Sequence, residues 1–368
     1  MEKNPVMTEQ NNNPDEITLL IGSYTDSLPH VQARGQGISV LRLSKESGRI
    51  TPVSQFTELR NPTYLTLSAD KKTLYSVEEL FGRDGSAVAA LSFDKASGAM
   101  RVLGRVDAEG DWPCHVALDK TGDRLFVSNY LSGNFVTCEL DASGVPTGVT
   151  VNIQRSGTGP NESRQEGPHV HCAAVTPDGG HVLVCDAGTD EIARYSLAKG
   201  LIETSSDLVV KTRGGYLPRH LALSTDGSQF FVVHELGCSV SAYAFDGDEI
   251  RLIQEISTLP EDFTGESACA AIRVHPNGRF VYASNRGHDS IVAFRVNADS
   301  GQMETVGWYS TQGETPRDFA IDPSGHYLVA ANQDGHSLVV YKIDQTSGAL
   351  SPFGATYEIG SPVSVVFA

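Results

Sequence analysis

Residues 217–235 read LPRHLALSTDGSQFFVVHE, and this stretch decides the fold. Two short apolar runs flank its Thr-Asp-Gly-Ser segment, and an Asp-Gly pair between apolar strands is typical of a β-hairpin. The same pattern returns at residues 61–79, 112–130, 170–187, 269–286 and 315–333. The sequence therefore predicts six copies of one hairpin, which indicates a repeat protein.

The spacing of these hairpins indicates the architecture. Their turn residues, at positions 71, 122, 179, 227, 278 and 325, are separated by 51, 57, 48, 51 and 47 residues. Each hairpin is followed by a less regular pair of strands, such as SIVAFRVNADSG at residues 290–301. A period near 50 residues built from four short strands is typical of β-propeller blades. The period exceeds that of WD40 repeats, and no Trp-Asp signature occurs.

The two ends of the chain hold the pieces of a seventh blade. GSPVSVVFA at residues 360–368 matches the first strand of the hairpin, and ITLLIGSYT at residues 17–25 matches the second. QGISVLRLSKESG at residues 36–48 supplies the third strand. We therefore predict an all-β, seven-bladed β-propeller with four-stranded antiparallel blades, one of them closed jointly by the N- and C-termini. Residues 17–368 form this single domain, and residues 1–16 are expected to be a disordered polar tail.

Charge and composition narrow the possible partners. Twenty-eight Lys and Arg against 45 Asp and Glu leave a net charge of −17. This charge argues against nucleic acid and against an anionic membrane surface as partners, and an anionic ligand would need a local cluster of cations.

No apolar run approaches the roughly 20 residues that span a bilayer. The first residues lack an apolar signal-peptide core, so we expect a cytoplasmic protein. The six cysteines form no CxxC pair and are expected to be small buried hydrophobes.

Hairpin geometry indicates where a site would lie. Residues eight before and eight after each turn lie side by side at the open end of the hairpin, because neighbouring strands are about 4.8 Å apart. The first strand of each blade should line the central channel, so these positions gather at one mouth of it. The first ring reads Thr63, Cys114, His171, Arg219, Ala270 and Arg317, with Val363 completing it; the second reads Glu79, Tyr130, Ala187, Glu235, Arg286 and Gln333. Polar residues that differ from blade to blade indicate a site, although solvated loop ends with incidental ion pairs are the alternative.

Individual residues of these two sets of hairpin positions are candidates for acid–base catalysis, substrate binding or metal binding. His171 is the best imidazole for acid–base work, because its ordinary pKa lies near neutrality, and His169 lies two residues earlier. Arg219 and Glu235 occupy paired positions, where they form either a plain cross-strand salt bridge or a substrate-binding pair. Arg286 has no acidic neighbour in sequence, which favours substrate binding. The His-x-His spacing could chelate a metal, but the nearby arginines would repel a divalent cation, so no metal is expected.

Other common catalytic patterns are missing. There is no G-x-S-x-G elbow and no glycine-rich phosphate loop, and no base is evident for Cys114. Asn129, Asn285 and Asn332, with Asp186 at the equivalent place, are expected to bond backbone groups rather than substrate.

Several segments resemble a known family. IGSYT at 21–25, SNYLSGN at 128–134, GPHVHC at 167–172 and SNRGHDSIVAF at 284–294 are similar to segments of the bacterial 6-phosphogluconolactonase family with a seven-bladed β-propeller. The resemblance covers residues 17–368. It implies hydrolysis of 6-phospho-glucono-δ-lactone in the pentose phosphate pathway, with no cofactor. A related branch, the fungal carboxymuconate cyclases, acts on the interconversion of lactone and muconate.

The resemblance also implies a set of site residues. The family's His, two Arg and Glu fall on the catalytic candidates His171, Arg219, Arg286 and Glu235. In the mechanism we hypothesise, an arginine pair polarises the lactone carbonyl while Glu235 or His171 acts as the general base. Further substrate-binding candidates are His115, Tyr130, His169, Arg317 and Gln333. One departure from the pattern leaves Ala270 and Ala271 in the ring.

Three functions therefore remain open from the sequence. The first is a lactone hydrolase with a small anionic lactone as its partner. The second is a lactonising or isomerising enzyme of the muconate type. The third is a non-catalytic propeller that docks proteins, because a fold does not fix a function.

Overall fold

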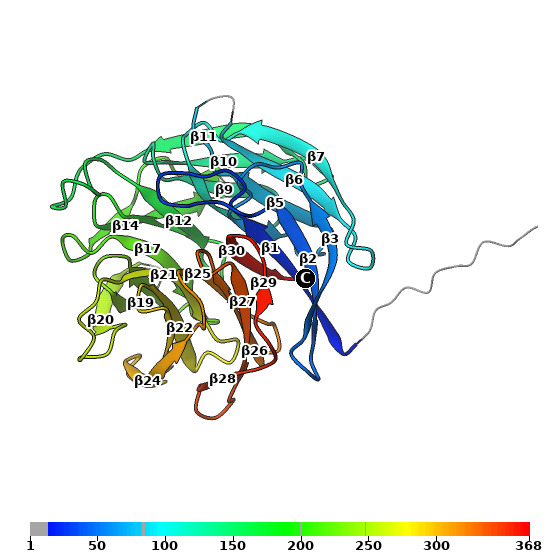
Figure 1. Ribbon diagram of the computed structural model, residues 1–368. Coiled ribbons are helices and arrows are strands. Elements are labelled where there is room, and N and C mark those ends of the chain that lie inside the picture. Colours follow the sequence, from blue (N-terminus) through cyan, green and yellow to red (C-terminus); the bar gives the residue numbers. More distant parts are fainter. Residues whose placement is uncertain (1–13, 83–84, 199–200, 247) are drawn as a thin grey trace, which may run out of the picture.

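The computed structural model describes residues 14–82, 85–198, 201–246 and 248–368, and these form seven sheets around a central axis (Figure 1). The predicted all-β, seven-bladed propeller is confirmed. The predicted polar tail falls mostly outside the described residues, and the first strand begins at Glu16. None of the described residues belongs to a helix long and apolar enough to cross a membrane.

Each blade runs from an inner strand at the channel to an outer strand at the rim. Blade 1 consists of β30 (Pro362–Phe367), β1 (Glu16–Ser23), β2 (Ile38–Ser44) and β3 (Ile50–Phe56). Blade 2 consists of β4 (Leu65–Leu67), β5 (Thr73–Glu78), β6 (Ala87–Phe93) and β7 (Met100–Asp107). Blade 3 consists of β8 (Pro113–Leu118), β9 (Arg124–Asn129), β10 (Asn134–Leu140) and β11 (Pro146–Gln154).

The remaining blades repeat this order, but two of them have a divided outer strand. Blade 4 consists of β12 (Val170–Val175), β13 (His181–Asp186), β14 (Glu191–Ala198), β15 (Leu201–Ile202) and β16 (Leu208–Lys211). Blade 5 consists of β17 (Pro218–Leu223), β18 (Gln229–His234), β19 (Ser239–Phe245) and β20 (Ile250–Ser257). Blade 6 consists of β21 (Ala268–Val274), β22 (Phe280–Arg286), β23 (Ser290–Val296) and β24 (Met303–Ser310). Blade 7 consists of β25 (Pro316–Ile321), β26 (Tyr327–Asn332), β27 (Ser337–Ile343), β28 (Leu350–Pro352) and β29 (Tyr357–Glu358).

The ring is closed by pairing between the two ends of the chain. Strand β30, red in Figure 1, lies antiparallel to the blue β1, with Leu20 opposite Val366. Beyond the strand, the Ala368 main-chain N–H donates to the Thr18 carbonyl at 3.0 Å. The inner strand of blade 1 thus comes from the C-terminus, and its neighbours come from the N-terminus. This pairing covers an edge of β1 that would otherwise be open.

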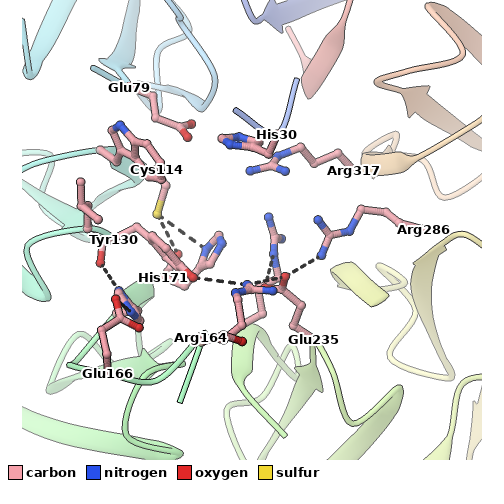
Figure 2. A pocket seen from close by; sticks show the side chains of 15 residues that line it. His30, Glu79, Cys114, Tyr130, Arg164, Glu166, His171, Glu235, Arg286 and Arg317 are labelled. Carbon is pink, nitrogen blue, oxygen red and sulfur yellow. Dashed lines mark hydrogen bonds and ion pairs between the residues drawn. The ribbon is translucent and has the colours of Figure 1, made fainter. Parts of the chain in front are cut away.

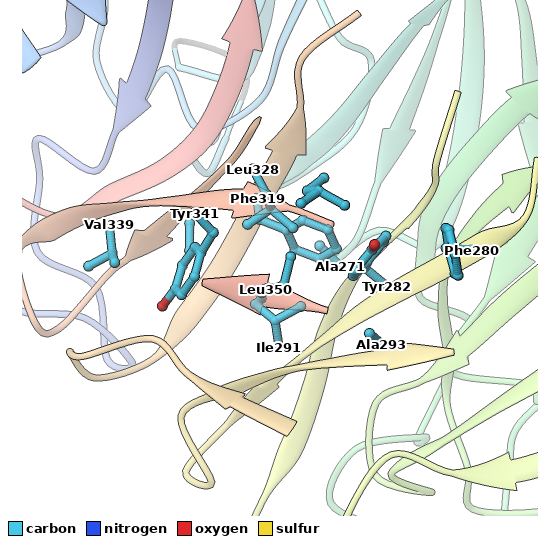
Figure 3. Packing of buried hydrophobic residues seen from close by; sticks show 12 residues of the cluster. Ala271, Phe280, Tyr282, Ile291, Ala293, Phe319, Leu328, Val339, Tyr341 and Leu350 are labelled. Atoms are coloured by element: carbon cyan, nitrogen blue, oxygen red, sulfur yellow. The ribbon is translucent and has the colours of Figure 1, made fainter. Parts of the chain in front are cut away.

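A separate hydrophobic cluster fills each of the seven interfaces between blades. Successive side chains of a strand point to opposite faces, so Leu19 and Ile21 face blade 7 while Leu20 faces blade 2. Figure 3 shows the cluster between blades 6 and 7, where the fully buried Phe319 and Tyr282 take part. Because both faces of each sheet are covered, second strands such as β18 and β26 read as nearly continuous apolar runs.

The hairpin turns keep the same backbone conformation in every copy. Five turn residues are glycines with φ between +71° and +78°, a region that glycine enters without steric cost. Lys71 adopts the same conformation in blade 2, with φ of +59°. Conserved turn geometry keeps the two strands in register, which is why positions counted from the turn are equivalent in all blades.

The inner strands of six blades begin with a β-bulge or a similar irregularity, and this feature shapes the site. In blade 2, β4 pairs with β5 without one. In blade 5, Pro218 pairs with His234 and His220 pairs with Val233, so Arg219 has no residue opposite it. Register shifts at the same place in the other blades leave Cys114, His171, Arg317 and Val363 unpaired in the same way. A bulge turns a side chain away from the regular alternation of a strand. These five bulged residues all belong to the first of the two predicted rings.

The recurring asparagines tie each blade to the one before it. Asn129, Asn285 and Asn332 are fully buried at the end of the second strand of their blades. Each donates from Nδ2, over 2.9 Å, to a carbonyl just after the outer strand of the preceding blade, at Ala108, Thr258 and Thr311 respectively. The expectation of backbone bonding is confirmed, with the acceptor in the neighbouring blade.

Replacing Asn129 by alanine should destabilise the protein by roughly 1–3 kcal/mol, because the buried carbonyl of Ala108 would lose its donor. Urea denaturation of the wild type and of Asn129→Ala measures this difference. Equal unfolding midpoints and slopes would show that the bond between blades contributes nothing to stability.

Candidate functional site

A cavity of about 430 Å³ lies at the mouth of the central channel, where the open ends of the hairpins meet (Figure 2). It is lined by His30, Glu79, Trp112, Cys114, Tyr130, Leu131, Ser163, Arg164, Glu166, His169, His171, Arg219, Glu235, Arg286 and Arg317. These residues come from six blades and from two loops, so only the closed ring brings them together.

Three structural positions supply most of the lining. Bulged residues at the start of inner strands supply Cys114, His171, Arg219 and Arg317. The ends of second strands supply Glu79, Tyr130, Glu235 and Arg286. The loop between β1 and β2 adds His30, and the loop between β11 and β12 adds Ser163, Arg164, Glu166 and His169.

Glu235 is surrounded by three arginines from three different segments. Its Oε1 lies 2.9 Å from Nη2 of Arg164 and 3.1 Å from Nη2 of Arg286. Its Oε2 lies 3.6 Å from Nε of Arg219. The predicted Arg219–Glu235 pair is therefore present, and Arg286 finds in the preceding blade the acidic partner that its own sequence neighbours lack.

This arrangement fixes the charge of the cluster. Burial by itself would raise the pKa of the Glu235 carboxyl, but the three guanidinium groups, led by that of Arg286, outweigh it and hold this pKa well below its usual value. Burial, followed by repulsion from Arg286 and Arg317, lowers the pKa of Arg219 to about 10. At neutral pH the carboxylate and the arginines are all charged. Glu235 is consequently a weak base.

His171 is buried and neutral at the same mouth. Burial, followed by the charge of Arg219, lowers the pKa of His171 well below its ordinary value. Its Nδ1 lies 3.6 Å from Sγ of Cys114, and its other ring nitrogen has no hydrogen-bond partner in the described part of the chain. Burial also raises the pKa of the Cys114 thiol, which therefore stays protonated and unsuited to nucleophilic attack.

Arg317 is the least engaged cation of the site. Its guanidinium lies 5.5 Å from the ring centre of Tyr24 and has no hydrogen bond or ion pair with a described residue. Tyr24 donates from its hydroxyl to Oε1 of Glu79 at 2.7 Å, and Oε2 of Glu79 accepts from Thr63 at 2.5 Å. Burial, then repulsion from Arg317, lowers the pKa of the nearby His30 to about 4.

Aromatic rings form the opposite wall. The ring of Tyr130 stacks on that of His169, with centroids 4.5 Å apart and planes 14° from parallel. On its other side, Trp112 lies nearly parallel at 6.5 Å. Nδ1 of His169 lies 2.9 Å from the Tyr130 carbonyl, and its Nε2 lies 3.2 Å from Oε1 of Glu166. His169 therefore supports Tyr130 and does not pair with His171.

A second layer of imidazoles lies below the cavity in the channel. The ring of His220 lies 5.2 Å from that of His171 and 5.6 Å from that of His115. His115 itself contacts Sγ of Cys172 at 3.5 Å and packs on Tyr64 at 4.3 Å between ring centres. Nδ1 atoms of both deeper histidines are buried without a hydrogen-bond partner.

Seven of the nine candidates from the sequence share the cavity, and His115 and Gln333 do not line it. His115 follows the bulged Cys114 along β8 and faces the deeper layer instead. Gln333 is buried and donates from Nε2 to Asp334 at 2.9 Å. Within the described residues, no three His, Cys, Asp or Glu side chains gather in a way that could hold a metal ion.

The sequence reasoning missed Arg164, Trp112 and His30, and it counted Glu79 in a ring without selecting it. Arg164 has no counterpart in the repeat, but its loop explains the longest interval between turns, 57 residues between Gly122 and Gly179. His30 lies in the long connection between β1 and β2, which also falls outside the repeat. Trp112 is the first residue of a hairpin copy, where other blades carry smaller residues.

A scan of family models matches residues 18–367 to the lactonase family with a 7-bladed β-propeller. This protein belongs to that family. A 6-phosphogluconolactonase of Bacillus subtilis is 35% identical over 304 residues, which are 82% of this chain and 84% of the relative. A Bacteroides fragilis protein of known structure is 30% identical and superposes with a TM-score of 0.89 over 97% of this chain and 99% of that one. The periplasmic gluconolactonase of Pseudomonas aeruginosa is 30% identical, with a TM-score of 0.88 over 96% and 99% of the two chains.

The buried neutral histidines of this lactonase-family protein should make its stability depend on pH. Burial lowers the pKa to about 3 for His115, to about 4 for His234 and well below normal for His171 and His220. In the unfolded chain they titrate near 6.5. Their contribution to stability is therefore present above pH 6.5 and is lost as the pH falls, by up to about 1.4 kcal/mol per pH unit for each histidine.

Urea denaturation at pH 7.5, 6.5 and 5.5 measures this loss. His220→Gln should flatten the dependence on pH, whereas the exposed His326→Gln should leave it unchanged. A free energy of unfolding that stays constant between pH 7.5 and 5.5 would contradict the expectation.

Proposed function

We propose that this protein hydrolyses 6-phospho-glucono-δ-lactone to 6-phosphogluconate. Membership of the lactonase family supports hydrolysis of a lactone, and the observation that carries the finer proposal is the convergence of four arginines and a neutral imidazole on one cavity. Lactone opening by water needs a stabilised oxyanion and a proton acceptor. The cavity offers both groups within one enclosure.

In this proposal the buried arginines stabilise the oxyanion. Nε atoms of Arg219 and Arg286 are buried without a hydrogen-bond partner, although each guanidinium is anchored to a main-chain carbonyl, at 2.7 and 2.8 Å. Fixed cations in a site of low dielectric stabilise developing negative charge strongly, because they need no reorganisation during the reaction. Glu235 holds these groups in place through its ion pairs.

His171 is the better candidate for the general base. Glu235 is held as a carboxylate by three cations, and its oxygen atoms already face them, so it has little tendency to accept a proton. His171 is neutral, and its Nε2 atom has no hydrogen-bond partner among the described residues. A neutral imidazole can accept a proton from water and return it later in the same reaction.

The proposed reaction conserves atoms and charge. Water attacks the lactone carbonyl carbon while its proton passes to His171, and the carbonyl π electrons move to the oxygen facing the arginines. The tetrahedral oxyanion then collapses, the ring C–O bond breaks, and the leaving alkoxide takes the proton from the imidazolium of His171. The product is an open hydroxy acid, and the free base is restored.

The phosphate would be bound by the cations that Glu235 does not neutralise. The cavity holds four arginines against Glu79, Glu235 and the largely exposed Glu166, in a protein of net charge −17. This local excess supports an anionic substrate, because the rest of the surface repels one. Arg317 has no ionic partner among the described residues and is therefore our candidate for the phosphate contact.

A comparison of substrates tests the proposal. We expect kcat/KM for 6-phospho-glucono-δ-lactone to exceed that for glucono-δ-lactone by about tenfold or more, because charge-assisted bonds to the phosphate are lost with the second substrate. Rates are measured by pH-stat titration and corrected for spontaneous opening. A muconate-type lactone as the better substrate, or no acceleration of any lactone, would refute the proposal.

Within the same assay, His171→Gln should lower kcat by roughly 10²- to 10⁴-fold, because glutamine cannot accept a proton. His326→Gln is the matched control, since His326 is exposed in the hairpin turn of blade 7 and, among the described residues, its ring bonds only Ser324 Oγ, at 3.1 Å. Unfolding temperatures of both variants establish that the fold is intact. Full activity in His171→Gln would remove His171 from the mechanism.

The lowered pKa of His171 also predicts the pH profile. Because the imidazole stays unprotonated below its ordinary value of 6.5, kcat/KM should remain constant as the pH falls from 7.5 to 6. The acidic limb should lie below pH 6. Measurements in buffers of constant ionic strength test this, and a half-maximal rate at pH 6.5 or above would contradict it.

A further inference from the structure

Trp112 departs from the repeat at a position where packing does not require an aromatic residue. Trp112 lies two residues before the bulged Cys114 and is followed by proline. The equivalent residue that precedes a proline is Asn61 in blade 2, Leu217 in blade 5, Thr315 in blade 7 and Ser361 in blade 1. Asn61, Leu217 and Ser361 are fully buried at this position. Trp112 is only partly buried and lines the cavity. Its size therefore serves the cavity and not the contact between blades.

The backbone at this position makes a large side chain costly. Trp112 has φ of +52°, and the equivalent Asn61, Leu217, Thr315 and Ser361 have φ between +41° and +59°. Such values are uncommon for residues other than glycine and asparagine, and they are unfavourable for bulky ones. The Trp112 N–H donates to the Leu80 carbonyl at 2.9 Å, and its own carbonyl accepts from Tyr130 at 3.0 Å. The fold thus imposes the conformation, and tryptophan is retained despite its cost.

Neighbouring rings hold the indole in place. Tyr130 lies nearly parallel to it, and the ring of His30 meets it at 63° with 5.7 Å between centres. Tyr130 is itself stacked on His169, so three rings form a row along one wall. Such a row offers a rigid apolar surface that needs little ordering when a ligand binds.

Two of the four arginines, Arg286 and Arg317, lie across the cavity from Tyr130, whereas Nη2 of Arg164 lies 3.3 Å from the Tyr130 hydroxyl. Trp112 and Tyr130 belong to the start and the second strand of blade 3, and blades 6 and 7, three and four places further around the ring, supply Arg286 and Arg317. Figure 2 shows Tyr130 on one side of the cavity, with Arg286 and Arg317 on the opposite side. The cavity therefore has an aromatic wall at blade 3 and a cationic wall at blades 6 and 7, and Arg164 reaches from the Glu235 carboxylate to the Tyr130 hydroxyl.

We propose that Trp112 is a specificity-determining residue that stacks on the face of a six-membered sugar ring while the arginines hold the anionic edge of the same molecule. The C–H bonds on the face of such a ring carry partial positive charge and match the negative face of the indole. The inference rests on the proposed lactone hydrolysis and adds to it: the site selects a closed ring over an open chain. An extended acid of equal charge would satisfy the arginines but not the aromatic wall.

Two sugar phosphates that the protein cannot hydrolyse as lactones test the preference for a closed ring by binding alone. Glucose 6-phosphate has a closed ring that cannot be hydrolysed as a lactone, and sorbitol 6-phosphate has the same charge in an open chain. We expect the wild type to bind the ring about tenfold more tightly, within the range that aromatic contacts provide. Isothermal titration calorimetry measures both affinities. In Trp112→Asn this preference should disappear, whereas the loss of affinity for the open chain should be small.

Asparagine is chosen because it occupies this position as Asn61 in blade 2 and tolerates the left-handed backbone. The variant should therefore unfold at the same temperature as the wild type or higher, which separates loss of binding from loss of fold. The chain has two tryptophans, and Trp308→Phe leaves Trp112 as the sole tryptophan, whose emission can be excited selectively over that of the tyrosines. Trp308 lies on the outer strand β24, so this variant should bind and hydrolyse like the wild type.

In Trp308→Phe, glucose 6-phosphate should change the fluorescence of Trp112 in a saturable way. Fluorescence of Trp112 that does not change at saturation would overturn the proposed stacking surface. A Trp112→Asn variant that prefers glucose 6-phosphate over sorbitol 6-phosphate as strongly as the wild type does would overturn it too. If the wild type still hydrolyses the lactone in that case, the proposed function stands alone. If ring binding depends on Trp112 but no lactone is hydrolysed, the stacking surface stands and the proposed function fails.

Discussion

The pairing of β30 with β1 is the constraint on which the rest of the structure depends. Each blade presents two apolar faces, and neither is covered unless a neighbour lies on each side. Closing the ring supplies the last neighbour and covers the edge of β1 that would otherwise be open. It also brings the open hairpin ends of all blades to one mouth. The site is therefore a product of closure, because its residues come from segments as far apart in sequence as His30 and Arg317.

Within the closed ring, the β-bulge at the start of the inner strands provides side chains that line the cavity and can act on a ligand. Regular alternation along an inner strand would direct each side chain toward one interface or the other. The bulge adds one residue that belongs to neither, and in four blades that residue is Cys114, His171, Arg219 or Arg317. The blades that carry Ala270 and Val363 in the same place contribute buried apolar residues instead. Variation at one repeated position thus determines both the shape and the charge of the mouth.

The sequence predicts the fold well, because turn spacing and the two partial strands at the ends carry the whole topology. It also brings His171, Arg219, Glu235 and Arg286 to one mouth, since equivalent positions stay equivalent while the turns keep their geometry. Counting from turns says nothing about loops outside the repeat, which is why Arg164 and His30 were missed. Counting from turns also gives no direction for a side chain that follows a bulge. His115, one residue beyond Cys114, was therefore assigned to the cavity although it faces the deeper layer of histidines in the channel.

The crowding of guanidinium groups has a consequence for the unfolding equilibrium. After burial, repulsion from Arg286 and Arg317 contributes to the lowered pKa of Arg219, so the mutual repulsion of these arginines works against the folded state. A bound anion relieves this repulsion and binds only the native chain, which links ligand concentration to resistance against heat through mass action. Any anion that binds at this mouth would therefore also stabilise the folded chain, and the gain in stability would rise with the concentration of that anion.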